Sequence, residues 1–490
     1  MLLSRYIDKK VGCFSYLSKR ENTTKCIIAK FHFNIFGCRN RFDMKKALKI
    51  FAVLVVILGI VIAFNYSRLN IISGYSAKSM NSSVFVAGRS VEFTDATDNS
   101  FGPINIADDV VDTSKKMASA SVYGFMTRKA VYRNGLGSVL ITDDYDLSQE
   151  TPVPHRSSIT RMTPYPYGGM KQKDTIFSNV NYDQINDAVK YAFTKVDGED
   201  IKKTRAVLVI YKDQILAEKY ADGFDKDSKI LGWSMTKSLI STMYGILQYQ
   251  GKLSVWDKAP IEAWQDDERK EITIHNLLQM NSGLEWEEDY GKISDVTKML
   301  FLEKDMTKSQ IDKPLIGKPN ETWYYSSGTS NLLSGILRKQ FNRHQDYLNF
   351  PYDEFIDKIG MHSMLIEADM EGNYVGSSYG WATPRDWAKF GLLYLHKGNW
   401  NGTQLFDASW IDYVTKPTPT SDGRYGAHFW LNAGGFHPDV PKDMYSANGY
   451  QGQRVYIIPS KDLVVVRFGL AGSSGIDFNK FLSEITTAIE

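Results

Sequence analysis

The order of hydrophobic and polar positions predicts that strands near residue 210 and strands near the C-terminus belong to one sheet. Runs with the alternating or β-branched pattern of strands are 205–211, 214–220, 428–433, 454–458 and 463–469. Runs with apolar residues at helical spacing flank these strands, at 182–196 and 476–489. The chain between the two groups of strands is mostly helical in pattern, up to about residue 415.

These runs predict a fold of the α/β (α+β) class, with the helical middle inserted into a sheet. The early and late strands can pair only with each other, because the segment between them is helical. We therefore expect one antiparallel sheet with the N- and C-terminal helices on one face. The first inserted helix would begin just before Ser234 and end at Gly251, so Ser234 would lie at the seam between the two halves, where pockets form.

The region before residue 178 has a less regular pattern. Short strand-like runs occur at 83–87 and 137–141, among frequent Ser, Asn, Asp and Gly residues. We treat residues 68–178 as an extension of unknown role that precedes the main domain or packs on it.

An apolar run near the N-terminus has the pattern of a targeting segment. Residues 50–64 carry no charge, and lysines stand directly before them. This arrangement favours a transmembrane signal anchor at 47–67, with a cleaved signal peptide and a buried core helix as the alternatives. Residues 1–46 would then be a basic cytoplasmic tail, unless Met44 is the true start. We expect the rest of the chain at the bacterial cell envelope, membrane-anchored and facing outward, or exported.

Composition narrows the function classes. The chain has 490 residues and a formal net charge of +2, which gives no reason to expect a nucleic-acid partner. Cys13, Cys26 and Cys38 all precede the apolar run, so the rest of the chain has no disulfide, thiol nucleophile or cysteine-based metal site. No histidine pair has metal-ligand spacing, and the acidic run at 285–289 is typical of a solvated loop at the rim of a site. We expect neither a metal nor a cofactor.

The tetrad Ser234-Met-Thr-Lys237 is the first candidate for chemistry. In a helix, residues i and i+3 lie one turn apart on one face, so the Lys237 amine can reach the Ser234 hydroxyl. A serine hydroxyl is a poor nucleophile until a base takes its proton, and a lysine can be that base when burial lowers its pKa. The alternative is a serine near a helix N-terminus with an exposed lysine, a pattern that occurs by chance in many proteins.

Two further segments carry groups that acyl transfer needs. Tyr325-Ser-Ser327 can place a phenol and a hydroxyl on the same side of a tight turn, and a nearby lysine ammonium would help the phenol act as a base. Asn448-Gly449-Tyr450 borders a strand, where glycine permits close backbone approach and N–H groups can face an oxyanion. The alternatives are a packed aromatic turn and an ordinary glycine-rich hairpin.

The order of these three segments resembles the serine β-lactamase and penicillin-binding-protein superfamily. The branch that the chain resembles most holds class C β-lactamases, DD-peptidases, esterases and 6-aminohexanoate-dimer hydrolases. The likeness covers about residues 180–490 and includes the stretches 251–257, 272–284 and 383–391. It implies a β-lactamase/transpeptidase-like serine hydrolase domain at 179–490.

The resemblance also implies roles for the residues of the three segments. Ser234 would be the acyl-accepting nucleophile, and Lys237 and Tyr325 would share proton transfer, with either one as the base. Ser327 would contact the lysine and the substrate. The backbone N–H groups of Ser234 and Tyr450 would form the oxyanion hole.

One position departs from the pattern of the family. Many relatives carry Lys or His where Ala447 stands, so a cation that would pair with a substrate carboxylate is missing. This favours a neutral, small-molecule ester or amide as the substrate, or a carboxylate held elsewhere, for example by Arg454.

Three hypotheses about function remain. The first is a serine hydrolase that works through a Ser234 acyl-enzyme, and the runner-up is a penicillin-binding or sensor protein of the same fold that acylates slowly or does not hydrolyse. A Ser-His-Asp hydrolase is disfavoured, because there is no Gly-x-Ser-x-Gly and because His275 and His428 stand in apolar runs typical of core or wall histidines.

Overall fold

The structure, a computed structural model, describes residues 44–157, 161–472 and 475–490. The three cysteines and residues 1–43 of the predicted basic tail lie outside the described residues. The chain from Ile62 to Glu490 forms one compact unit, which contains a six-stranded sheet, the helical middle and the extension.

The six-stranded sheet is antiparallel and joins the two ends of residues 179–490, the predicted catalytic region, as the sequence predicted. Its order is β12-β13-β14-β15-β5-β6, so the last long strand pairs with the first, with Val465 opposite Val209. The strands are β5 (Thr204–Tyr211), β6 (Gln214–Tyr220), β12 (Trp430–Leu431), β13 (Tyr445–Gly449), β14 (Gln453–Ile458) and β15 (Leu463–Gly469). The predicted strand at 428–433 is shortened to β12, because His428 has a positive φ of 63° that breaks the extended backbone.

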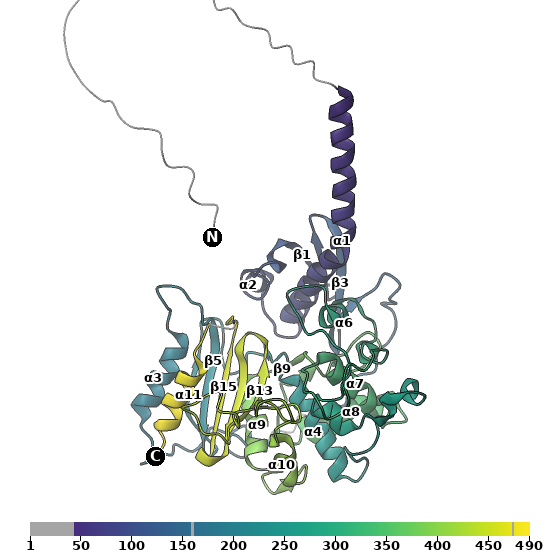
Figure 1. The fold of residues 1–490 in the computed structure, drawn as a ribbon. Helices are drawn as coiled ribbons and strands as arrows, with labels where there is room; N and C mark the ends of the chain where they lie inside the picture. The colour runs from purple at the N-terminus through teal and green to yellow at the C-terminus, as the bar shows by residue number, and fades with distance from the viewer. Residues whose placement is uncertain (1–43, 158–160, 473–474) are drawn as a thin grey trace, which may run out of the picture. The chain divides into compact units, whose positions relative to one another are not determined.

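Both faces of the sheet are covered by helices. Helices α3 (Tyr182–Phe193) and α11 (Phe478–Thr487) pack against each other on one face, where they bury Val207 and Val209 of β5 (Figure 1). Helix α9 (Pro384–Leu395) packs on the other face. Every residue of β5 is buried, which follows from having a hydrophobic layer on each side.

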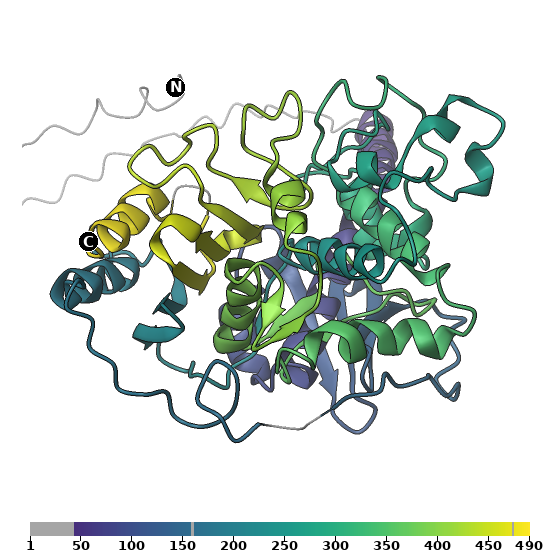
Figure 2. The same cartoon turned by 90° about the horizontal axis from the view of Figure 1, so that it is seen from below.

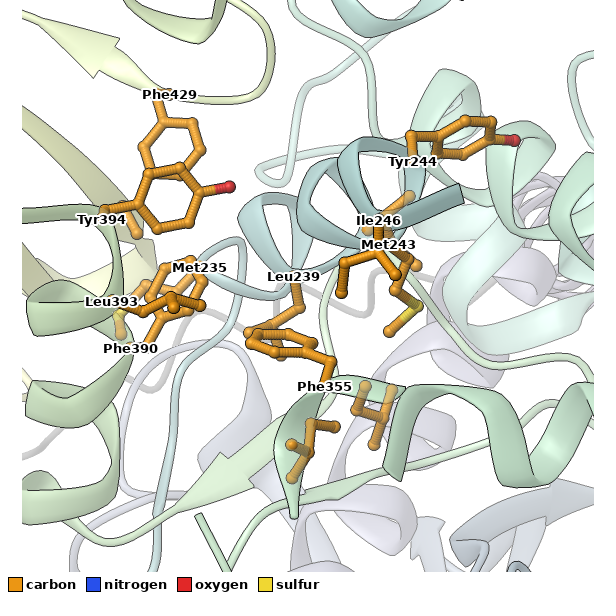
Figure 3. Close-up of a cluster of buried hydrophobic side chains, with 14 of the residues drawn as sticks. Met235, Leu239, Met243, Tyr244, Ile246, Phe355, Phe390, Leu393, Tyr394 and Phe429 are labelled. Carbon is orange, nitrogen blue, oxygen red and sulfur yellow. The ribbon is translucent and has the colours of Figure 1, made fainter. Parts of the chain in front are cut away.

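Helix α4 (Thr236–Tyr249) runs through the centre of the helical part and is buried on all sides up to Leu247. Figure 3 shows Leu239 of this helix beside Phe355, within the main hydrophobic core. Such a helix has no solvent face, so the groups at its N-terminus are held by packing from every direction. The other helices of this part are α5 (Ile274–Leu278), α6 (Asp295–Leu302), α7 (Ser327–Arg338), α8 (His344–Pro351) and α10 (Ser409–Thr415).

Short strands and short helical segments complete the fold. A three-stranded sheet has the order β7-β9-β8, and a two-stranded hairpin pairs β10 with β11. Their bounds are β7 (Ile230–Leu231), β8 (Leu365–Ile366), β9 (Gly380–Ala382), β10 (Asn399–Trp400) and β11 (Thr403–Gln404). The short 3₁₀ helices are η1 (Ile104–Ile106), η2 (Glu262–Trp264), η3 (Glu268–Glu271), η4 (Met306–Lys308), η6 (Tyr450–Gly452) and η7 (Pro459–Lys461), and η5 (Tyr352–Ile356) is a π-helix. The helical middle and the strands of Figure 1 are seen from below in Figure 2.

The extension contains the C-terminal part of a long helix, a short helix and a four-stranded antiparallel meander. Its elements are α1 (Met44–Phe85), α2 (Val91–Ala96), β1 (Ala107–Asp112), β2 (Met117–Val122), β3 (Phe125–Arg133) and β4 (Gly137–Ile141), and the meander has the order β1-β2-β3-β4. The strand predicted at 137–141 is confirmed as β4. The strand-like run at 83–87 was a wrong prediction: it lies at the end of α1 and in the turn that follows.

Two buried ionic contacts hold the extension on the catalytic region. Lys78 of α1 contacts Glu367, and their side chains are 7% and 0% exposed. Asp98 after α2 contacts Arg205 at the start of β5, with 2.7 Å between NH2 and Oδ2. Burial would raise the pKa of Asp98, but the neighbouring guanidinium groups of Arg89 and Arg205 hold it at about 2.

The structure gives no support to the predicted membrane anchor at 47–67. That segment belongs to α1, whose first turn carries Lys45 and Lys46 and which continues past Arg68 into the folded extension. Over the described ranges of the chain, no helix has both the length and the apolar character that crossing a membrane requires.

Candidate active site

Ser234 lies in the turn between β7 and α4, two residues before the helix. The helix thus starts later than the sequence predicted. A backbone hydrogen bond of 3.0 Å from Lys237 N to Ser234 O nevertheless keeps the two residues one turn apart. Trp233, directly before the serine, has a φ of 49°. A bulky residue rarely adopts this conformation, and such strain is typical of functional sites, where the surrounding packing enforces it.

Lys237 is buried, and its amine contacts three oxygens. Nζ lies 3.1 Å from Ser234 Oγ, 2.9 Å from Ser327 Oγ and 2.9 Å from the carbonyl oxygen of Ser377. The side chain is only 1% exposed, and this burial lowers the pKa of Lys237 to about 8, although the carboxylate of Glu288 acts in the opposite direction. A fraction of the amine is therefore neutral near pH 7 and can accept a proton.

Tyr325 packs against the same amine from another side. Lys237 Nζ lies 5.0 Å from the centre of the Tyr325 ring, and the Ser234 hydroxyl is near enough to lower the pKa of the phenol. The ring is held by aromatic neighbours, with its centre 5.8 Å from that of Tyr425 and 5.4 Å from that of Trp430. Burial, followed by the charge of Glu288, raises the pKa of Tyr325 above its ordinary value, so the phenol keeps its proton.

Ser327 begins helix α7 and connects Lys237 to an acidic residue. Its hydroxyl accepts a hydrogen bond from Lys237 and donates one to Glu288 Oε1, and its backbone N–H donates to Glu288 Oε2 at 2.8 Å. The carboxylate of Glu288 also accepts hydrogen bonds from Trp286 Nε1 at 2.6 Å and from the hydroxyl of Tyr290 at 2.9 Å. The sequence did not indicate a role for Glu288. Its pattern predicted that residues 285–289 form a solvated loop at the rim of the site.

The end of strand β13 passes directly beside the turn that carries Ser234. A Cβ atom on Gly449 would lie 2.0 Å from the carbonyl oxygen of Gly232, so only glycine permits this approach. The next residue, Tyr450, packs its ring edge-to-face on Trp233, with 5.9 Å between the ring centres. The side-chain oxygen Oδ1 of Asn448 is buried and has no hydrogen-bond partner among the described atoms.

The structure shows what occupies the place where many relatives of the family carry a cation. Ala447 is fully buried in β13 and leaves no cation at this position. Arg454, on the neighbouring strand, donates from NH1 to the carbonyl oxygens of Gly449 at 2.7 Å and Gln453 at 2.8 Å. The guanidinium therefore fixes the end of β13, and its availability to a substrate carboxylate stays a prediction.

The ring nitrogens of the two histidines considered from sequence contact residues other than Ser234. His428 is 2% exposed, lies 2.9 Å from Ser330 Oγ and 2.7 Å from the carbonyl oxygen of Leu278, and burial lowers its pKa to about 3. His275 lies 3.1 Å from the Tyr413 hydroxyl, and burial lowers its pKa to about 4. Within the described residues there is no group of three or more His, Cys, Asp or Glu side chains that could hold a metal ion.

A known family model matches the part of the chain that carries these residues. The model of the beta-lactamase family matches residues 201–469, which is more than half of the chain, so the protein belongs to the beta-lactamase family. This membership defines a serine hydrolase of the β-lactamase superfamily and confirms the α/β, transpeptidase-like fold. No curated protein matches the chain.

Solved structures with the same fold include hydrolases of several kinds. The chain is similar to a putative 6-aminohexanoate-dimer hydrolase from Bacillus anthracis (19% identity, TM-score 0.50, 58% of this chain and 79% of that chain). It is also similar to a putative beta-lactamase from Bacteroides dorei (15% identity, TM-score 0.50, 63% of this chain and 99% of that chain). A third similar structure is EstCE1, a hydrolase with promiscuous acyltransferase activity (12% identity, TM-score 0.52, 63% of this chain and 99% of that chain). At these identities the likeness shows the fold.

Proposed function

We propose that the protein cleaves an ester or amide bond through an acyl-enzyme on Ser234, with Lys237 as the base. The observation that carries this proposal is the contact of 3.1 Å between Lys237 Nζ and Ser234 Oγ, made by a buried amine with a pKa of about 8. A lysine of ordinary pKa would be charged at neutral pH and could not take the serine proton.

The three contacts of Lys237 fit a neutral amine as well as a charged one. In the neutral form, two N–H groups can donate to Ser327 Oγ and the Ser377 carbonyl, and the lone pair faces Ser234. When the Ser234 oxygen attacks the substrate carbonyl, its proton passes to Lys237. The resulting ammonium is stabilised by the nearby Glu288 carboxylate, which favours the charged form.

The second half of the acylation step requires a proton on the leaving group. Lys237 or Tyr325 donates that proton as the bond between the carbonyl carbon and the leaving oxygen or nitrogen breaks. Tyr325 suits this task because burial keeps its phenol protonated and because its ring lies beside Lys237, which contacts Ser234. When Tyr325 is the donor, the Ser234 proton held by Lys237 passes to the phenolate, so both groups return to their starting states. Water then attacks the acyl-enzyme and gives a proton to Lys237, which passes it to the Ser234 oxygen as the acid is released.

The developing oxyanion needs two hydrogen-bond donors, and the backbone N–H groups of Ser234 and Tyr450 are our candidates. The close approach of Gly449 to Gly232 supports this assignment, because it brings the end of β13 against the nucleophile turn. Asn448 is our candidate for a substrate contact through its amide; its oxygen has no partner among the described atoms but is buried, so this contact requires a local shift of the side chain. The missing cation at Ala447 favours a neutral substrate.

Replacement of the nucleophile tests the proposal. Ser234→Ala should abolish hydrolysis of nitrophenyl esters and labelling by a fluorophosphonate probe, whereas Ser148→Ala, at an exposed serine, should leave both unchanged. Equal labelling of wild type and Ser234→Ala would overturn the proposal. A labelled or acylated Ser234 whose acyl group persists for hours with every ester tested would instead favour the sensor-like alternative.

We also propose, from the basic and apolar residues before position 68, that the catalytic region acts outside the cytoplasm. Fractionation of cells that produce the full-length chain tests this location. Recovery of the protein from the cytoplasmic fraction alone would contradict it.

A further inference from the structure

An apolar pocket opens beside Ser234, and part of its wall comes from the extension. Helix α1 contributes Ile71, Ile72 and Tyr75, and the segment after α2 contributes Phe101 and Ile104. The catalytic region supplies Ser234 itself and apolar side chains that include Trp233, Ile293, Leu300, Phe301 and Tyr450. The family match starts at residue 201, so the extension adds this wall from outside the part of the chain that defines the family.

The wall contributed by α1 is in direct contact with the nucleophile turn. The ring of Tyr75 stacks on that of Trp233, which directly precedes Ser234, with 6.2 Å between the ring centres. Tyr75 also packs on Phe301 of α6 at 5.5 Å. A Cβ atom on Gly74 would lie 3.4 Å from Phe301 Cβ, which shows how closely the two helices approach.

The position of this wall is fixed by buried charges. Lys78 lies one helical turn after Tyr75 and contacts Glu367, which also accepts hydrogen bonds from Ser82 Oγ at 2.9 Å and from the backbone of Ser138 at 2.8 Å. Moving α1 away from the site would break this buried ion pair and leave the Glu367 carboxylate without its cation, which is unfavourable. The pair therefore holds α1 in place as a wall of the pocket.

The chemistry of the lining points to an apolar, uncharged ligand group. The charged side chains of the lining are Arg68 and Lys292, and both are exposed, so they lie where the pocket meets solvent. The pocket encloses about 90 Å³. Since a water molecule needs roughly 10–15 Å³ of such space, several carbon atoms fit.

The pocket lies on one particular side of the nucleophile. Ser234 is part of its lining, whereas Lys237, Tyr325 and Ser327 are not among the described residues that line it. The leaving group must depart toward the residues that protonate it, which are Lys237 and Tyr325. The group that remains bound to Ser234 as the acyl-enzyme is therefore the one on the side of this pocket.

We propose that this pocket holds the acyl group of the substrate, and that the extension thereby selects esters with an apolar, uncharged acyl chain of several carbons over acetyl esters. The inference rests on the proposed function, because it assumes acylation of Ser234. It assigns a role in substrate selection to residues 68–104.

A series of p-nitrophenyl esters tests the inference on the unmodified protein. With the leaving group held constant from acetate through butyrate and hexanoate to octanoate, kcat/KM should rise about three- to fourfold per added methylene until the pocket is filled. A series that is flat, or that falls from acetate onward, would overturn the inference and leave the proposed hydrolase function intact. Failure to hydrolyse any ester, with Ser234 unlabelled by fluorophosphonate, would overturn both.

Two substitutions locate the selectivity in the extension. Ile71→Trp fills the pocket from α1 and should lower kcat/KM for hexanoate at least about tenfold more than for acetate, while Phe101→Ala should move the preferred chain length upward. Val110→Trp, at an exposed position of β1 outside the pocket, is the matched control and should leave the chain-length profile unchanged. A profile that neither pocket variant alters would place the acyl group elsewhere and refute the assignment.

Discussion

The pH dependence of acylation in a Glu288→Gln variant tests the chemistry of the site most directly. Burial lowers the pKa of Lys237 to about 8, and the Glu288 carboxylate, linked to the amine through Ser327, raises it. Lys237 accepts the Ser234 proton only when neutral, so kcat/KM of the wild type should rise with pH and level off above about 8. Removing the charge of Glu288 lowers the pKa of Lys237 further and moves this rise to lower pH.

The size of the shift follows from the arrangement. A lysine with a pKa of about 8 is neutral in about one molecule of eleven at pH 7. An opposite charge one bridging hydroxyl away shifts a pKa by roughly 1–3 units, so even the lower bound brings Lys237 to about 7 in the variant. The ratio of the rate at pH 7 to the plateau rate should then rise about fivefold, from about one-tenth to about one-half.

The assay measures kcat/KM for a nitrophenyl ester from about pH 5.5 to about pH 10, a range that extends well below and above the expected pKa of Lys237 in both proteins. Release is followed at the isosbestic wavelength of the product, so that its own ionisation does not distort the profile. The ratio to the plateau is the readout, because the variant can also lower the plateau by disturbing Ser327. Glu285→Gln, at an exposed carboxylate of the same loop, is the matched control and should keep the wild-type profile.

Two results would refute this reasoning. A wild-type profile that is flat across this range would show that Lys237 is not the titrating base. A Glu288→Gln profile that stays in place or moves to higher pH would show that the carboxylate does not stabilise the charged amine.

Three further predictions concern other parts of the structure. Tyr325→Phe should lower kcat by about 10²–10⁴-fold for alkyl esters, because the leaving group loses a proton donor. A nitrophenyl ester should be affected least, because its leaving group, nitrophenolate, departs without a proton. An equal loss with all esters would contradict this role. Gly449→Ala places a Cβ 2.0 Å from the backbone oxygen of Gly232, so the end of β13 must shift. The unfolding midpoint should therefore fall, and kcat of the folded protein should fall about 10²–10³-fold; unchanged kcat would count against the oxyanion assignment. Glu367→Gln leaves Lys78 buried without its partner and should lower the free energy of unfolding by about 3 kcal/mol in urea titrations, and a drop below about 1 kcal/mol would mean that the pair does not anchor the extension.

Much of the fold could be predicted because its determinants are local or follow from simple topology. The long strands 205–211, 454–458 and 463–469 show their β-branched pattern directly, and their pairing follows from the helical segment between them. The wrong predictions came where tertiary packing outweighed local preference. Residues 83–87 have a strand-like composition, but they end a helix whose face is buried against the meander.

The sequence by itself determined the nucleophile and base candidates, because two residues three apart in a helical turn lie next to each other regardless of the rest of the fold. Only the tertiary structure decided the surroundings that make them reactive. Burial of Lys237, the carboxylate of Glu288 behind Ser327, and the wall that Tyr75 forms beside Trp233 all depend on segments far apart in the chain. Contacts of this kind have no local signature in the sequence, because the residues next to each of these side chains do not determine whether it is exposed to solvent or buried. Only the packing of the whole chain brings these groups together.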